Sequence, residues 1–255
     1  MEIEFFDPTT TNSDQLDPAT FLSHCDRSPV YIMGFKIEPG DYERMVRDIA
    51  ECGEIPSSVL LMSSEGGDLG EAMKIGRLFR QGSIRIHLIG LQDCASACFF
   101  ILVGSPDRQI DGSISLHRPY YERSYFSGLE LDEAERRYAE LQDLARAYLF
   151  EMDVPNHIIE RMFAIPSGEV ERLSVDDIDR FIDGRTPAYG EWLAAKCGRV
   201  SREERRDYWQ AVVRSQEGFS EGYVKYLTNL MNTISPCEHG EIDPLRKELY
   251  LEIIP

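Results

Sequence analysis

Ser96 is the best candidate for a nucleophile in this chain, because it lies at the centre of the small-residue turn Cys94-Ala95-Ser96-Ala97-Cys98. The turn follows a strand predicted over residues 84–91 and leads into the apolar run 99–103. Small side chains let the backbone turn tightly and leave the hydroxyl accessible. The amide of Ala97, at the start of the following helix, could stabilise an oxyanion. A tightly packed helix start without chemistry would have the same residues.

A glycine-rich turn precedes this one in the chain. A predicted buried strand, residues 59–63, runs into Ser64-Glu65-Gly66-Gly67-Asp68, and apolar residues at helical spacing follow as far as Gly82. The glycine pair allows a sharp turn and leaves amides at a helix start without intrahelical partners. We expect the Gly67 amide to be an oxyanion donor. An ordinary strand-to-helix turn would also use such glycines.

His117 offers the base that a serine nucleophile needs. Asp111-Gly112 is a strong signal for a two-residue turn, and it predicts a hairpin whose second strand covers residues 113–117. Because side chains alternate along a strand, Ile114 and Leu116 share one face and His117 lies on the other. A neutral imidazole titrates in the range that suits proton transfer. A single histidine in such a place can equally be structural.

Three segments in this order resemble the proteolytic subunit of Clp proteases, in the Clp/crotonase superfamily that also includes signal-peptide-peptidase-like serine proteases. Ser64-Glu65-Gly66-Gly67 resembles the family's oxyanion turn, Ala95-Ser96-Ala97 its nucleophile turn, and His117-Arg118-Pro119 the strand end that carries its base. The resemblance covers residues 30–183. It implies a Clp/crotonase-like α/β fold of repeated ββα or βα units and activity on a peptide or protein substrate. It also implies a homo-oligomer joined through the long helix predicted over residues 131–150.

A third catalytic group, which would orient His117, is expected between residues 154 and 183. In the family an aspartate lies shortly before a Leu-Ser pair, which Leu173-Ser174 resembles, yet residues 168–172 contain no aspartate. Glu169 is the preferred substitute and Glu171 the alternative, since glutamate serves in some triads. A Ser-His dyad or an inactive site would also fit this departure from the family pattern.

Strands and helices alternate around these turns. A short strand over residues 3–6 and a short helix near Phe21 are expected first, then a strand over 30–37 and an amphipathic helix over 42–52. The alternation predicts an α/β fold with a largely parallel sheet and right-handed crossovers. Functional groups gather at the carboxyl ends of strands in such sheets, which is where the glycine turn and Ser96 lie.

The chain divides into an α/β domain over residues 1–185 and a helical C-terminal extension over residues 186–255. The extension contains no chemical motif. Helices are predicted over residues 189–197 and 205–215 and from Tyr223 to Ile234, and Pro236 is expected to end the last of them. The extension could contact a partner, cover the active-site cleft or complete an oligomer interface.

Charge and hydropathy exclude several classes of partner. The formal net charge of −18 and the pI near 4.7 argue against nucleic acid and anionic membranes, which both require basic patches. The N-terminus is acidic where a signal peptide would be basic, and no apolar run approaches the ~18 residues of a membrane span. We therefore predict a cytoplasmic protein without membrane insertion.

The six cysteines are too few for a disulfide scaffold of this length, so reduced thiols are expected. We interpret Cys94 and Cys98 as small packing residues around Ser96, with a metal or redox pair as the alternative, because the chain has no CxxC ligand pair. Cys237-Glu238-His239 is interpreted as a loop after Pro236. No metal site is predicted.

These observations favour a serine peptidase or peptidase-like hydrolase. Ser96 would attack an acyl carbon, with His117 as the base. The amides of Gly67 and Ala97 would form the oxyanion hole, Glu169 would orient the base, and no cofactor would be required. A crotonase-type acyl-CoA enzyme would use the same glycine amides without the serine and histidine. A catalytically inactive Clp-fold interaction protein is the other alternative, and the missing aspartate is its best support.

Overall fold

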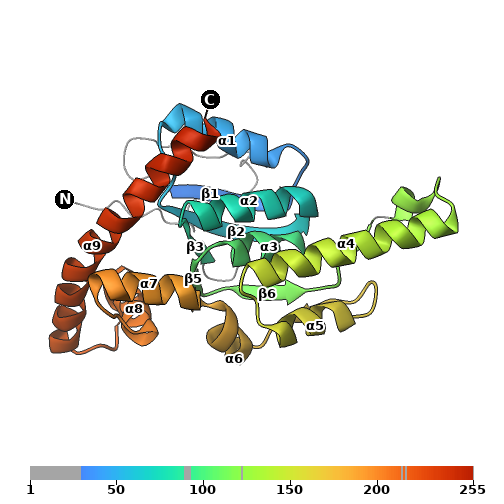
Figure 1. The fold of residues 1–255 in the computed structure, drawn as a ribbon. Helices are drawn as coiled ribbons and strands as arrows, with labels where there is room; N and C mark the ends of the chain where they lie inside the picture. The colour runs from blue at the N-terminus through green and yellow to red at the C-terminus, as the bar shows by residue number, and fades with distance from the viewer. Residues whose placement is uncertain (1–29, 89–92, 122, 214, 216, 255) are drawn as a thin grey trace, which may run out of the picture.

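The computed structural model describes residues 30–88, 93–121, 123–213, 215 and 217–254. The short strand and helix expected near the N-terminus lie outside these residues, as does Cys25. Within them the chain forms a mixed α/β fold with a mostly parallel sheet and a long C-terminal helix, as the alternation of elements predicts (Figure 1).

Eight strands of the described chain form one sheet, in the order β7-β6-β4-β2-β3-β5-β8, with β1 paired to β2. Neighbouring strands run parallel from β1 to β6, and only the short pairs β5–β8 and β6–β7 are antiparallel. The strands are β1 (Val30–Ile37), β2 (Ser58–Gly67), β3 (Arg85–Leu88), β4 (Asp93–Ala95), β5 (Asp107–Ile110), β6 (Ser113–Leu116), β7 (Glu171–Arg172) and β8 (Gly184–Arg185).

The hairpin predicted at Asp111-Gly112 is wrong. β5 pairs with β3 and β8, whereas β6 pairs with β4 and β7, so the strands on either side of the turn do not pair with each other. β3 pairs with the first part of β2 and β4 with a later part, both in parallel. β5 then pairs in parallel with β3, and β6 with β4. The Asp111 amide donates to the Leu88 carbonyl oxygen at 2.8 Å, which holds this connection against β3.

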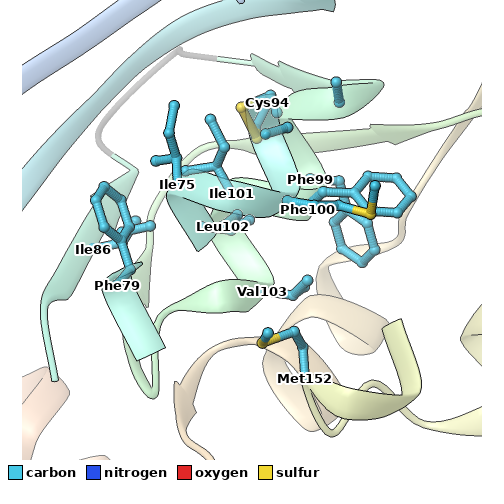
Figure 2. Packing of buried hydrophobic residues seen from close by; sticks show 14 of the residues in the cluster. Ile75, Phe79, Ile86, Cys94, Phe99, Phe100, Ile101, Leu102, Val103 and Met152 are labelled. Carbon is cyan, nitrogen blue, oxygen red and sulfur yellow. A yellow bond between two sulfur atoms is a disulfide. The ribbon is translucent and has the colours of Figure 1, made fainter. Parts of the chain in front are cut away.

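Five helices precede β7 in the described chain: α1 (Asp41–Cys52), α2 (Leu69–Gln81), α3 (Ala97–Gly104), α4 (Leu131–Glu151) and α5 (Asn156–Ala164). Every residue of α3 is buried, and Figure 2 shows this helix at the centre of the apolar core. Gly76 of α2 and Gly104 of α3 allow the two helices to touch, because a Cβ on Gly104 would lie 2.4 Å from the Gly76 Cα. Tyr148 of α4 donates to the Phe100 carbonyl oxygen at 2.8 Å. The core therefore fixes α3, and with it the Ser96 turn, against the sheet.

The 3₁₀ turn η2 (Arg123–Phe126) lies between β6 and α4. The helical segments between β7 and the C-terminal helix are α6 (Val175–Asp177), the π-helical turn η3 (Ile178–Ile182), α7 (Pro187–Cys197), α8 (Arg202–Tyr208) and the π-helical turn η4 (Trp209–Val213). Ser201 and Glu204 form a capping box at the start of α8, since the Ser201 hydroxyl accepts from the Glu204 amide and the Glu204 carboxylate accepts from the Ser201 amide. α8 is therefore stabilised at its N-terminus by its own sequence.

Pro236 does not end the last helix, contrary to the prediction. α9 runs from Glu221 to Ile253 with Pro236 and Pro244 inside it, and Figure 1 shows it bending along its length. A proline within a helix costs about 3 kcal/mol, because it removes a hydrogen bond and clashes with the preceding turn. α9 tolerates both prolines because it is packed on either side of them, with Ile234 and Leu249 buried.

The C-terminal part of α9 contacts the backbone at the starts of β2 and β3. Arg246 is 9% exposed, and its guanidinium donates to the carbonyl oxygens of Gly82, Ser83 and Ser57 at 3.1, 3.1 and 3.3 Å. Leu249 belongs to the same apolar cluster as the sheet. The extension thus shares the core of the α/β part, and a division into domains at residues 185 and 186 stays a prediction.

The expectation of reduced thiols is wrong. Disulfides join Cys94 to Cys98 and Cys197 to Cys237, and the described chain contains no free cysteine. The second bond connects α7 to α9 over a sequence separation of 40 residues. Cys237 therefore lies within a helix rather than in the loop predicted after Pro236. The sequence could not indicate these pairs, because both depend on how distant elements or a turn bring the sulfur atoms together.

Candidate active site

Three of the predicted site segments meet at the carboxyl ends of neighbouring parallel strands. β4 lies between β2 and β6, with Cys94 beside Ser64 on one side and Ala95 beside Ser115 on the other. The glycine turn ends β2, Ser96 follows β4, and His117 follows β6. The parallel register therefore brings the predicted nucleophile, base and oxyanion turn to one edge, as the sequence argument requires.

Ser96 has a backbone conformation that non-glycine residues seldom adopt. Its φ is 59° and its ψ is −127°, and its amide donates to the Ser115 carbonyl oxygen at 3.2 Å. Its own carbonyl oxygen accepts from the Phe99 amide at 3.0 Å and so begins α3. Such a conformation costs about 1–3 kcal/mol and persists only where the surroundings enforce it, which occurs most often at functional sites. Ala97 directly follows as the first residue of α3.

Gly66, rather than Gly67, is the glycine that lies against the nucleophile turn. A Cβ on Gly66 would be 2.4 Å from the Ser96 Cβ and 2.8 Å from the Ala97 amide nitrogen. The Gly66 amide donates to the Ser64 hydroxyl at 3.2 Å. A Cβ on Gly67 would point to β1, 2.0 Å from the Ile37 carbonyl oxygen. Sequence reasoning found the glycine pair but not this contact, because glycine spacing alone does not show which backbone the turn approaches.

The geometry at His117 defines which ring nitrogen carries the proton. The imidazole is half-buried, and its Nδ1 lies 3.0 Å from the carbonyl oxygen of Arg118. A carbonyl oxygen can only accept a hydrogen bond, so Nδ1 is the protonated nitrogen. In the neutral ring Nε2 is then the basic nitrogen, which is the form that a general base requires. The Tyr120 ring packs 5.3 Å from the imidazole, centroid to centroid.

Neither glutamate considered as the third catalytic group hydrogen-bonds to His117 among the described contacts. Glu169 is exposed and lines a shallow hollow of about 270 Å³ beside β7. The Glu171 carboxylate is paired with Arg161. β6 and β7 are antiparallel, with Ser115 opposite Arg172 and Leu116 opposite Glu171, and the pairing ends there, one residue before His117. The assignment of Glu169 stays a prediction.

A carboxylate that the sequence analysis did not single out lies on the strand face that leads to the site. Asp93 accepts from the Ser113 hydroxyl at 2.7 Å and from the Ser115 hydroxyl at 3.0 Å. These two hydroxyls lie on the face of β6 that the alternation assigns to His117, and what the sequence did not indicate is that the Asp93 carboxylate from β4 would reach them. The contacts join β4 to β6 beneath Ser96 and so support the turn.

The described part of the chain has neither a candidate metal centre nor a helix suited to a membrane. Its histidine, cysteine and acidic side chains form no group of three or more that could hold a metal ion. None of the described helices has the length and apolar character needed to cross a bilayer.

Comparisons with known proteins found similarity only among solved structures. No protein-family model matches the sequence, and no curated protein matches it. The chain is similar to a mutant of the 1510-N membrane-bound stomatin-specific protease, with a TM-score of 0.43 and 17% identity over 66% of this chain and 84% of that one. A second mutant of that protease, in complex with a substrate peptide, has a TM-score of 0.42 and 16% identity over 66% of this chain and 79% of that one.

The third similar structure is ClpP1 from Listeria monocytogenes. Its TM-score is 0.44 and its identity 14%, over 60% of this chain and 88% of that one. At these identities each similarity concerns the fold. The Clp/crotonase family assignment made from the three motifs therefore stays a prediction for this α/β chain.

Proposed function

We propose that this protein is a serine hydrolase of the peptidase type, with Ser96 as the nucleophile and His117 as the base. The observation that carries the proposal is the conformation of Ser96, whose φ of 59° places its hydroxyl on a tight turn between β4 and a buried helix. His117 directly follows β6, the strand beside β4. An L-residue held in this conformation at the carboxyl edge of a parallel sheet is typical of an exposed nucleophile.

In the proposed mechanism Ser96 Oγ attacks the carbonyl carbon of a peptide substrate and its proton passes to His117 Nε2. The resulting oxyanion is stabilised by the amides of Ala97 and Gly67. His117 then gives the proton to the departing amine, and a water molecule activated by the same nitrogen hydrolyses the acyl-enzyme. The Arg118 carbonyl holds the ring in the required tautomer, with Glu169 proposed as an additional orienting group. The chemistry requires no cofactor.

Labelling with a fluorophosphonate serine-hydrolase probe tests this proposal. We expect the purified protein to be labelled, Ser96→Ala to abolish labelling and His117→Ala to slow it by about 10²–10⁴-fold, the usual contribution of a general base. Ser127→Ala and His239→Ala are matched controls on exposed residues and should label normally. A folded protein that the probe does not label would refute the hydrolase and favour a non-catalytic interaction protein. Labelling that survives Ser96→Ala would refute this assignment of the nucleophile.

We also propose that the protein forms a homo-oligomer through α4. Figure 1 shows the N-terminal part of this helix projecting beyond the sheet. Leu131, Leu144 and Phe150 are exposed along it, which leaves apolar surface on a helix otherwise rich in charge. Size-exclusion chromatography with light scattering should give a mass that is a multiple of 29.2 kDa. A monomer at micromolar concentration would contradict the proposal.

The two disulfides bear on the cellular compartment of the protein. Disulfides persist mainly in oxidising compartments, so the bonds at Cys94–Cys98 and Cys197–Cys237 weigh against the cytoplasmic location expected from the sequence. Fractionation of the native host cells, with a cytoplasmic marker as reference, would assign it.

A further inference from the structure

The Cys94–Cys98 disulfide spans the turn that carries Ser96. The two Cα atoms are 5.3 Å apart, with a sequence separation of four residues, and both side chains are fully buried. Cys94 belongs to β4, where it is paired with Ser64 and Ile114 on the neighbouring strands. Cys98 is in the first turn of α3. One end of the bond is therefore fixed to the sheet and the other to the helix, with Ser96 midway between them.

The turn needs such a constraint because Ser96 is strained. A positive φ in a residue with a Cβ is retained only when several contacts enforce it. Three contacts enforce it here. The Ser96 amide donates a hydrogen bond to the Ser115 carbonyl oxygen, the Phe99 amide donates one to the Ser96 carbonyl oxygen, and Gly66 packs closely against Ser96. Two of these are hydrogen bonds that can open, whereas the disulfide is covalent.

The second disulfide provides a contrast. The stabilisation from a disulfide grows with the length of the loop that it closes, because a longer loop restricts the unfolded chain more. Cys197–Cys237 closes a long loop between α7 and α9, away from Ser96. Cys94–Cys98 closes a very short one. The long-loop bond is therefore suited to stabilising the whole fold, and the short-loop bond to fixing a local conformation.

We propose that Cys94 and Cys98 are positioning residues, whose disulfide holds the Ser96 hydroxyl in the orientation needed for attack. This inference rests on the proposed function. The reactivity of Ser96 then depends on the oxidised pair. When a dithiol reduces the bond, the two thiols of the reagent become its own disulfide, and Cys94 and Cys98 each receive one electron and one proton to become thiols. The backbone at Ser96 is then free to relax to a negative φ.

The test compares two variants that each remove one disulfide, Cys94→Ala/Cys98→Ala and Cys197→Ala/Cys237→Ala. Fluorophosphonate labelling is measured over a range of probe concentrations to separate kinact from KI, and thermal unfolding is followed in parallel. We expect Cys94→Ala/Cys98→Ala to lower kinact about tenfold or more, because Ser96 is then no longer held in its strained conformation. Its KI should not change. Cys197→Ala/Cys237→Ala should keep its kinact and lose more thermal stability.

A second arm avoids dependence on the folding of the first variant. Cys197→Ala/Cys237→Ala protein is treated with increasing dithiol, and alkylation with mass spectrometry reports the state of Cys94 and Cys98. Labelling should fall in parallel with reduction of this pair and return on reoxidation. If the parent protein labels, but substitution or reduction of Cys94 and Cys98 leaves kinact unchanged, the positioning role is refuted and the proposed hydrolase stands. If the parent protein does not label, the hydrolase proposal fails and this inference fails with it.

Discussion

Gly66 and Ser96 touch at a point where both backbones have positive φ values, 92° and 59°. The contact leaves no room for a side chain on Gly66, because a Cβ there would overlap the Ser96 Cβ and crowd the Ala97 amide. This single glycine therefore lets the end of β2 approach both the nucleophile and one proposed oxyanion donor. At the scale of one residue, reactivity of the site should depend on the absence of one methyl group.

Gly66→Ala tests this dependence. We expect the rate of fluorophosphonate labelling to fall about 10²-fold or more, comparable to the loss of an oxyanion donor, because the added methyl displaces Ser96 or Ala97. Gly53→Ala is the matched control: Gly53 also has a positive φ, of 76°, but a Cβ there would meet nothing within 4 Å. Gly53→Ala should lose about 1 kcal/mol of stability from backbone strain, and Gly66→Ala should lose more, because its methyl group also overlaps Ser96. Equal labelling by the two variants would show that the Gly66 contact has no catalytic consequence.

The pairing of β6 with β7 determines which residues lie near His117, the proposed base. These strands continue the sheet beyond β4 and pair as far as Leu116 and Glu171, and the next residues outward from this pair are His117 and Val170, which is exposed. The side chain at position 170 is apolar, and we expect a carboxylate introduced there, beside the end of this pairing, to come within reach of His117 Nδ1. The Arg118 carbonyl oxygen accepts the hydrogen bond from Nδ1 instead. A neutral carbonyl stabilises the imidazolium that forms during catalysis less than a carboxylate would.

Val170→Asp should therefore accelerate the proposed reaction. We expect labelling to become about tenfold faster, since a carboxylate beside the base contributes several decades in established triads and this site is partly solvated. Val170→Asn has nearly the same shape without the charge and should label like the parent protein. If Asp and Asn variants label alike, Val170 does not occupy the orienting position, and Glu169 becomes the better candidate.

Across the whole molecule, buried charge and an aromatic stack join the sheet to the C-terminal helices. Asp107 of β5 accepts from Arg85 at 2.7 Å and from Arg185 at 3.1 Å, and Arg185 also donates to Glu238 of α9 at 2.6 Å. His87 of β3 stacks on Trp209, with ring centroids 4.6 Å apart. Its Nδ1 is buried and has no hydrogen-bond partner among the described residues. Burial, reinforced by the positive charge of Arg85, lowers the pKa of His87 to about 4.

This shift predicts a loss of stability in mild acid. Between the usual pKa of 6.5 and the folded value of about 4, the unfolded chain binds a proton at His87 that the folded chain does not. Stability therefore rises with pH in this window and is lost as pH falls through it. His87→Phe keeps a ring against Trp209 and removes the titration. Going from about pH 7.5 to about pH 5, the parent protein should lose about 2 kcal/mol of unfolding free energy relative to this variant.

Urea unfolding at the two pH values measures that difference. The exposed His239 provides the control, because His239→Ala should follow the parent protein at both pH values. Identical pH dependence in the parent protein and His87→Phe would mean that His87 is hydrated in solution and that the contact between the sheet and η4 opens readily.

The amino-acid sequence by itself determined the elements and the edge at which the candidate site lies. Hydrophobic periodicity and small-residue turns are local properties, so the alternation of strands and helices, the parallel sheet and the long α4 helix could be predicted from them. In a parallel sheet the strand ends share one edge. This is why Ser96 and His117 could be expected to approach each other without any knowledge of the strand order.

Only the tertiary structure decided which groups meet at that edge. Asp111-Gly112 has the local signature of a hairpin, but the pairing of its strands with β3 and β4 outweighs it. Pro236 has the signature of a helix end, but packing on both sides of it carries α9 onward. The contact of Gly66 with Ser96, the contact of His117 Nδ1 with the Arg118 carbonyl oxygen and the disulfide between Cys94 and Cys98 depend on atoms brought together by the fold. Sequence spacing constrains such contacts weakly, because they are set by the balance of packing over the whole core.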